Sequence, residues 1–332
     1  MDPIQIKKEA LEAEIRIRRF IRETPVEYSP YLSQMGSCHV YLKLENIQLT
    51  GSFKLRGAAN KLLSLSQEEK EKGVVTASTG NHGSAFVYMT KILGIKGMIY
   101  LPENASKIKI SHLRDYGANL KFFETDCVKT EEFARKTAEK NDLLYISAYN
   151  DPQIIGGQAT VGIELLRQLK VINVVLVPVG GGGLISGISG YLKCGNTDIK
   201  TIGCQPLNSP VMCESIKAGR IIEMESKSTL SDGTAGGIEQ GAVTFPICEN
   251  YVDDFILVTE EEIKDAIKLF LEKHHMLIEG AAALPVASFI KTKKKFKNKN
   301  VALIISGAKL CPEKLKEVFC PKHKLSTNRD YS

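Results

Sequence analysis

The stretch Gly51-Ser52-Phe53-Lys54-Leu55-Arg56-Gly57-Ala58 carries the strongest signal in the chain. It sets one lysine, Lys54, between small residues and an aromatic ring, an arrangement that presents an amine to an aldehyde cofactor. Burial lowers the pKa of a lysine, so that part of the amine is neutral near pH 7 and can act as a nucleophile. The alternative is an exposed lysine at the start of a helix, because lysine is common on protein surfaces.

A second motif supplies what an anionic cofactor needs. The sequence Gly180-Gly181-Gly182-Gly183-Leu184 follows the apolar run 171–179, which reads as a buried strand. Successive backbone N–H groups in such a loop can turn towards an anion, and the positive N-terminus of the next helix strengthens the attraction. The motif therefore predicts a phosphate site. A merely flexible loop is the alternative, although four glycines cost backbone entropy that needs a compensating role.

A dinucleotide site is a further alternative for the glycine motif. Its Gly-x-Gly-x-x-Gly register fails in every frame, because the last position falls on Ile185 or Ser186. The next predicted strand ends near Gln205, without the acidic residue that would bind a ribose. Pyridoxal phosphate, with one phosphate and an aldehyde for Lys54, fits the two motifs better.

A third motif, Ser78-Thr79-Gly80-Asn81-His82-Gly83, lies just before a predicted helix at 84–93. Short polar side chains and free N–H groups at a helix N-terminus can hold a carboxylate. Helix capping alone is the alternative, since Ser, Thr and Asn are ordinary capping residues.

With these three motifs the chain resembles the type II pyridoxal phosphate enzymes, and among them the serine/threonine dehydratase and serine racemase group, from about Glu14 to Lys309. The resemblance implies an α/β fold of the tryptophan synthase β-like kind, with two open parallel-sheet domains and the cofactor in the cleft between them. It makes Lys54 the catalytic lysine and implies that Phe53 packs on the cofactor ring.

The resemblance also implies roles in substrate binding. It assigns Ser78, Thr79, Asn81 and His82 to the loop that binds the carboxylate of the amino acid substrate. Asn81 would also reach the phenolic oxygen of the cofactor.

Further cofactor contacts follow from the same resemblance. Ser306 is similar to a family serine that bonds the pyridine nitrogen, Gly233 would pack on the other face of the ring, and Glu279 resembles a glutamate near the cofactor. A buried glutamate is costly without a partner, so we expect one for Glu279. Many relatives carry asparagine where this chain has Lys309.

Two departures from the family pattern narrow the function. Metal-dependent members have a glutamate at the position of Gln205 and an aspartate at that of Val211, so we expect no metal site there. Racemases place a serine opposite the catalytic lysine, and threonine deaminases tend to have alanine, whereas this chain has Thr79. Threonine keeps the hydroxyl but its methyl restricts the rotamer, which leaves racemisation open without favouring it.

The expected activity is pyridoxal phosphate dependent β-elimination of L-serine, L-threonine or a related 3-hydroxy amino acid, giving a 2-oxo acid and ammonia. The alternatives are an amino acid racemase that uses Lys54 and Thr79 as bases on opposite faces, and a β-replacing synthase of the cysteine synthase kind. A non-catalytic small-molecule sensor that kept the fold is a third.

The chain length and the predicted order of strands and helices limit the possible architectures. The 332 residues, 43% of them hydrophobic, suit two domains. Strands and helices are predicted to alternate, which indicates parallel sheets covered on both faces. We expect a large cofactor-binding domain from 1–72 and 151–320, a small substrate-carboxylate domain at 73–150, and a flexible tail at 321–332.

Composition excludes several classes of partner. Much of the net charge of +6 lies in the run 291–299 and in the polar tail after Pro321, and the run reads as a solvated loop rather than a nucleic-acid site. No 18-residue apolar run and no apolar leader are present, so we expect a soluble cytoplasmic protein without membrane contacts. The eight cysteines lack zinc spacing and read as reduced thiols. The family resemblance implies a homodimer.

Overall fold

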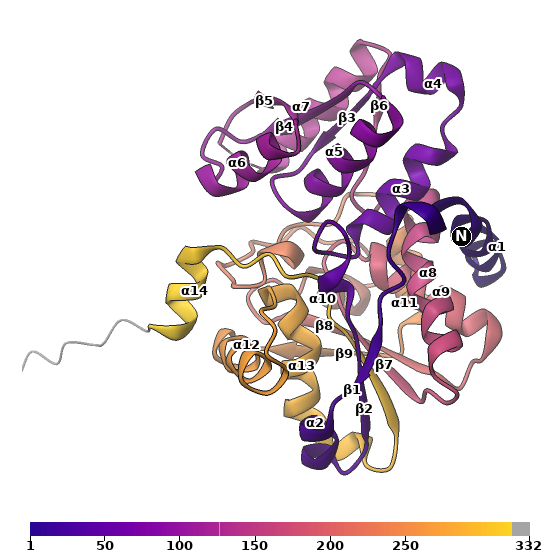
Figure 1. The fold of residues 1–332 in the computed structure, drawn as a ribbon, viewed down its shortest axis with the longest axis vertical. Helices are drawn as coiled ribbons and strands as arrows, with labels where there is room; N and C mark the ends of the chain where they lie inside the picture. Colours follow the sequence, from indigo (N-terminus) through magenta and orange to yellow (C-terminus); the bar gives the residue numbers. More distant parts are fainter. Residues whose placement is uncertain (126, 321–332) are drawn as a thin grey trace, which may run out of the picture.

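Two β-sheets organise the chain in the computed structural model, which describes residues 1–125 and 127–320 (Figure 1). The larger sheet has the strand order β1-β2-β10-β7-β8-β9, and the smaller one has the order β5-β4-β3-β6. The larger sheet contains β1 (Val26–Tyr28), β2 (His39–Lys43), β7 (Val174–Pro178), β8 (Lys200–Pro206), β9 (Asp254–Val258) and β10 (Asn300–Ile304). The smaller sheet contains β3 (Val74–Ala77), β4 (Gly97–Leu101), β5 (Asn119–Phe122) and β6 (Leu144–Tyr145).

Neighbouring strands are parallel in both sheets, except that β1 runs antiparallel to β2 at the edge of the larger sheet. The expected α/β fold with two parallel sheets is therefore confirmed, with one antiparallel edge strand that the sequence did not predict.

Helices cover both faces of the larger sheet. On one face α13 (Gly280–Thr292) packs across β7 to β10, and α12 (Glu260–His274) packs on α13. On the other face lie α8 (Pro152–Gln168) and α9 (Gly183–Gly195), with α1 (Pro3–Ile17) outside them. Alternate residues of β7 point to opposite faces, so that Val174 and Leu176 join one apolar cluster and Val175 and Val177 join another. The remaining helices around this sheet are α2 (Pro30–Gly36), α10 (Val211–Lys217), α11 (Thr244–Tyr251) and α14 (Pro312–Phe319).

The smaller sheet is also covered on both faces. Helix α7 (Cys127–Lys140) packs on β3, β4 and β6, and α5 (Asn81–Leu93) with α6 (Lys107–Asp115) lies on the opposite face. Helix α4 (Gln67–Lys72) leads into β3. Helix α3 (Lys54–Ser64) contacts both α5 and α8, so it joins the two sheet units.

Figure 1 shows the segment from β3 to β6 as a separate unit above the larger sheet. We keep as a proposal the division into a domain of 1–72 with 151–320 and a domain of 73–150. The predicted flexible tail, 321–332, lies outside the described residues.

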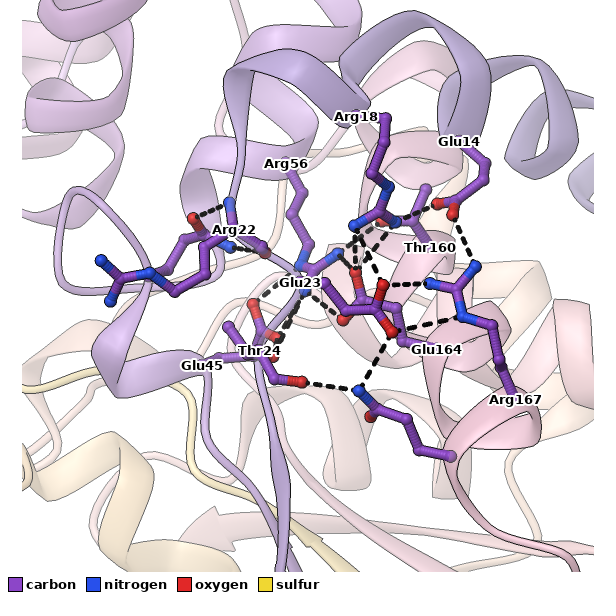
Figure 2. A network of polar contacts seen from close by, with 12 residues as sticks. Glu14, Arg18, Arg22, Glu23, Thr24, Glu45, Arg56, Thr160, Glu164 and Arg167 are labelled. Atoms are coloured by element: carbon purple, nitrogen blue, oxygen red, sulfur yellow. Dashed lines mark hydrogen bonds and ion pairs between the residues drawn. The ribbon is translucent and has the colours of Figure 1, made fainter.

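A buried cluster of charges ties α3 to its neighbours (Figure 2). The guanidinium of Arg56 donates to Glu45, in the 3₁₀ turn Glu45–Ile47, at 2.8 Å and to Glu164 of α8 at 2.7 Å. The Lys43 ammonium of β2 donates to Glu164 at 2.6 Å, and Arg18 of the 3₁₀ turn Arg18–Phe20 does so at 3.0 Å. Arg56, Lys43, Glu45 and Glu164 are fully buried, so the segment that follows the candidate catalytic lysine is fixed from several sides.

Candidate active site

One cavity of about 570 Å³ lies between elements of the two sheet units. Every site residue that the sequence predicted lines it: Phe53, Lys54, Ser78, Thr79, Asn81, His82, Gly180, Gly181, Gly182, Gly183, Leu184, Gly233, Glu279 and Ser306. The structure thus brings together segments that are far apart in the chain.

Lys54 is the first residue of α3, and its side chain faces the cavity. The preceding loop runs beside the end of β10, where the Phe53 amide donates to the Ser306 carbonyl at 3.1 Å. The Lys54 ammonium donates to the Ala148 carbonyl at 2.9 Å and lies 5.1 Å from the centre of the Phe53 ring. Although the cavity leaves part of Lys54 accessible, enclosure of the amine lowers its pKa to about 8, and the charge of Glu279 opposes only part of that change. The environment of Lys54 therefore favours the neutral form of its amine, which is the form that acts as a nucleophile.

The glycine loop connects β7 to the N-terminus of α9. A Cβ atom added at Gly181 would lie 2.6 Å from ring atoms of Tyr149, and one at Gly180 would lie 2.9 Å from the Thr234 Cα. Gly182 has a φ of +88°, a conformation that side chains rarely adopt. The loop is therefore a close-packed backbone cradle at a positive helix end, which fits a phosphate group.

The predicted carboxylate loop meets the N-terminus of α5, which begins at Asn81 rather than at Ser84 as expected. Ser78 accepts a hydrogen bond from the Gly80 amide at 3.3 Å, and Thr79 lines the cavity. His82 is buried, with its Nε2 3.3 Å from the Ile146 carbonyl. Burial and the nearby charge of Lys54 lower the pKa of His82 to about 3, so its ring is neutral at pH 7.

Glu279 has the partner that the sequence led us to expect. It is 6% exposed at the start of α13, and the Asn81 amide donates to both of its oxygens at 2.9 Å. The main-chain amide of Lys309 donates to Oε2 at 3.3 Å. Burial raises the pKa of Glu279 to about 7, and these hydrogen bonds limit the change.

Three buried polar atoms of cavity-lining side chains have no hydrogen-bond partner among the described residues. They are Oγ of Ser306, which is 1% exposed just after β10, Oδ1 of Asn81 and Nε2 of His112. A buried hydroxyl without a partner is costly, so a ligand that offers one is favoured. The pyridine nitrogen of pyridoxal phosphate is such a group. Together with the Lys54 amine and the glycine cradle, Ser306 makes the site fit this cofactor.

Sequence reasoning missed several residues of the cavity. Tyr149, in the loop after β6, packs against the glycine loop and accepts from the Glu239 amide at 2.8 Å. At another part of the cavity wall, Lys109 of α6 forms an ion pair with Asp232 at 2.9 Å. Tyr149 and the Lys109–Asp232 pair belong to no sequence motif, because their positions at the cavity depend on how the two sheet units pack together.

The two positions discussed for metal binding lie in β8 and at the start of α10. The side chain of Gln205 donates to the Val179 carbonyl at 3.2 Å and accepts from the Cys213 amide at 2.9 Å. Val211 belongs to an apolar cluster. The absence of metal binding at this site stays a prediction.

Comparisons with known proteins agree with this geometry. A sequence profile of the family described as pyridoxal-phosphate dependent enzyme matches residues 17–307. L-threonine ammonia-lyase from Thermotoga maritima is 41% identical over 299 residues, which are 90% of this chain and 74% of that protein. The processed form of threonine deaminase isoform 2 from Solanum lycopersicum has a TM-score of 0.91 at 33% identity and covers 95% of this chain and 87% of its own. Maize serine racemase has a TM-score of 0.88 at 31% identity, with coverage of 94% and 95%.

Proposed function

The chain belongs to the pyridoxal-phosphate dependent enzymes, and from this premise we propose that it is an ammonia-lyase that dehydrates and deaminates L-threonine, L-serine or a related 3-hydroxy amino acid. The observation that carries the proposal is one cavity that holds Lys54, the glycine cradle and the N-terminal turn of α5. The products are a 2-oxo acid and ammonia.

The residues that would hold the cofactor are those of this cavity. The glycine loop and the N-terminus of α9 would bind its phosphate, Lys54 its aldehyde and Ser306 its ring nitrogen. When bound, pyridoxal phosphate supplies an electron sink for the α carbon of the substrate. A hydroxyl at the ring nitrogen stabilises its protonated form less than a carboxylate would, which favours loss of a β leaving group over a long-lived carbanion.

The protein's own groups then divide the work. Ser78, Thr79 and the N–H groups of the α5 turn orient the substrate carboxylate. The Lys54 amine, which has a lowered pKa, accepts the α proton as a general base. Closely packed walls keep these groups at fixed positions, which lowers the entropy cost of the reaction.

Racemisation of the same substrates is the second candidate function. Thr79 places a hydroxyl on the cavity wall, and maize serine racemase has a similar fold. The threonine methyl restricts how that hydroxyl can turn, so we rank this activity below elimination.

We also propose that the protein is a homodimer, on the basis of the family resemblance, and that it acts in the cytoplasm. Within residues 1–125 and 127–320, the helices are all too short or too polar to cross a membrane.

The test is an assay of purified protein with pyridoxal phosphate and L-serine, L-threonine or L-threo-3-hydroxyaspartate, following 2-oxo acid release and enantiomer composition together. We expect oxo acid release that Lys54→Ala abolishes and that Lys91→Ala, an exposed lysine near the end of α5, leaves unchanged. Enantiomer interconversion without oxo acid would favour the racemase instead. If a bound cofactor gives neither activity, the lyase proposal is wrong and a synthase or sensor takes its place.

A further inference from the structure

Lys309 is one of the charged residues of the cavity to which the proposed mechanism gives no role. It follows β10 in the segment Ser306-Gly307-Ala308-Lys309, and its ammonium donates to Oγ of Ser84 in α5 at 2.6 Å. Its main-chain amide donates to Glu279 at 3.3 Å. Lys309 therefore contacts both Glu279, which precedes α13 in the larger sheet unit, and the first turns of α5.

The same two elements meet at a second point. Asn81, the first residue of α5, donates to both oxygens of Glu279, which precedes α13. The pairs Asn81–Glu279 and Ser84–Lys309 lie within one turn of α5, and Lys309 also contacts Glu279 directly. The position of the Asn81 amide at the cavity thus depends on Lys309 through the helix and through the carboxylate.

Charged side chains from several neighbouring segments lie around Glu279. Lys309 and Lys54 are positive neighbours, Lys109 of α6 faces it from the smaller sheet unit, and Asp232 is a negative neighbour. Lys309 lowers the pKa of Glu279 through the charge of its ammonium group and through the hydrogen bond of its main-chain amide, and both oppose the effect of burial.

A third element faces the Lys309 ammonium. His112 of α6 lines the cavity, and burial together with the charge of Lys309 lowers the pKa of that histidine. Burial lowers the pKa of Lys309 itself to about 8, and Glu279 opposes this change. At neutral pH Lys309 is therefore still largely a cation, next to a carboxylate that is close to its own pKa.

We propose that Lys309 is a positioning residue, which fixes Glu279 and the first turns of α5 so that the Asn81 amide is held at the cofactor ring. The inference rests on the proposed function only in requiring that pyridoxal phosphate binds in this cavity. A direct consequence is that removal of the Lys309 charge makes Glu279 easier to protonate.

The test uses the holoprotein and the absorbance of its bound cofactor as a function of pH. Lys309→Met removes the charge and the donor while keeping an unbranched side chain, and Lys309→Arg keeps the charge. Lys316→Met, at an exposed position of α14, is the matched control. Cofactor affinity is measured in parallel by equilibrium dialysis.

Because Glu279 becomes easier to protonate, we expect Lys309→Met to move the midpoint of the absorbance change on the acid side of the titration to higher pH. We also expect this variant to bind the cofactor about tenfold more weakly, the effect of one lost hydrogen bond to a charged group. Lys309→Arg should restore the midpoint, and Lys316→Met should match the unmodified protein. Ser84→Ala, which removes the acceptor of the Lys309 ammonium together with the hydrogen bond from Ser84 to the Gly80 carbonyl, should weaken binding in the same direction.

The inference is overturned if Lys309→Met titrates and binds cofactor as the unmodified protein does. Should that variant fail to fold by circular dichroism, an unchanged affinity in Ser84→Ala overturns it instead. Because these readouts require only bound cofactor, an absent lyase activity with an intact spectrum would reject the proposed function alone.

Discussion

The Lys54 amine combines a lowered pKa of about 8 with a position on the cavity wall. A lysine with the ordinary value of 10.5 has almost no neutral amine at pH 7, whereas a pKa near 8 leaves about one amine in ten neutral. Only the neutral amine attacks an aldehyde. The rate at which apoprotein captures pyridoxal phosphate should therefore rise with pH and level off above about pH 8.

Stopped-flow absorbance of apoprotein mixed with excess cofactor measures this rate. Lys54→Ala should show no slow covalent phase at any pH. A rate that keeps rising towards pH 10 would show that the amine is not desolvated as the structure indicates.

At the scale of single residues, the site could be predicted where its chemistry lies within a short stretch of sequence. Lys54, the glycine loop and the segment 78–83 are such stretches, and all line the cavity. The Asn81–Glu279 pair joins residues 198 positions apart, so the sequence indicated that Glu279 needs a partner but not which one. Lys309 was recognised as a departure from the family, and its contact with Ser84 could only come from the structure.

Among the elements, the glycine loop between β7 and α9 gives a sharp prediction. Gly181→Ala places a methyl group 2.6 Å from the Tyr149 ring, a distance that real Cβ atoms do not show. Either the ring or the loop must move, and the loop carries the N–H groups that would bind phosphate. We expect Gly181→Ala to weaken cofactor binding at least tenfold, the loss of about 1.4 kcal/mol.

Gly195→Ala is the matched control, because an added Cβ at the end of α9 meets no atom within 4 Å. Equilibrium dialysis of both variants with pyridoxal phosphate compares them directly. Equal affinities in the two variants would contradict a phosphate-binding role for the loop.

Element boundaries were predictable where periodicity and caps agree. The sequence pattern predicts a helix from Gln158 to Leu169, whereas α8 begins at Pro152, because Asp151 caps it by accepting from the amides of Gln153 and Ile154. Helix α13 was not predicted, since it is buried on all sides from Gly280 to Phe289 and so lacks a polar face. The edge strand β1 has three residues, too few for an alternating pattern.

At the scale of the whole molecule, the alternation of strands and helices was sufficient to predict two parallel sheets. It did not show how they are joined. Helix α3 contacts both units, and its Arg56 enters the buried charge cluster with Glu45 and Glu164 (Figure 2). Lys43 joins the same cluster through its ion pair with Glu164. A buried arginine two residues after the candidate catalytic lysine has no local signal, because its partners lie on the 3₁₀ turn Glu45–Ile47, on α8 and at Thr24 before β1.

This cluster gives the last prediction, which concerns global stability. Burial alone would raise the pKa of Glu164, but Arg56 and Lys43 outweigh it and lower that pKa to about 2. Glu164→Gln keeps the shape of the side chain and leaves Arg56 and Lys43 with less buried negative charge. Breaking a buried pair in this way costs about 3–5 kcal/mol in the free energy of unfolding, and urea unfolding at pH 7 would measure it.

The pH dependence of the same variant separates charge from packing. The pKa of Glu164 in the folded protein lies below its ordinary value of 4.5, so its stabilising contribution is present above about pH 4.5 and is lost as the pH falls towards 2. The difference between the unmodified protein and Glu164→Gln should therefore shrink over that range. Glu214→Gln, which removes the half-buried partner of the exposed Lys217, should change stability by less than about 1 kcal/mol and serves as the control. A pH-independent loss in Glu164→Gln would assign its effect to packing, and a loss as small as that of the control would show that the cluster does not hold α3 in place.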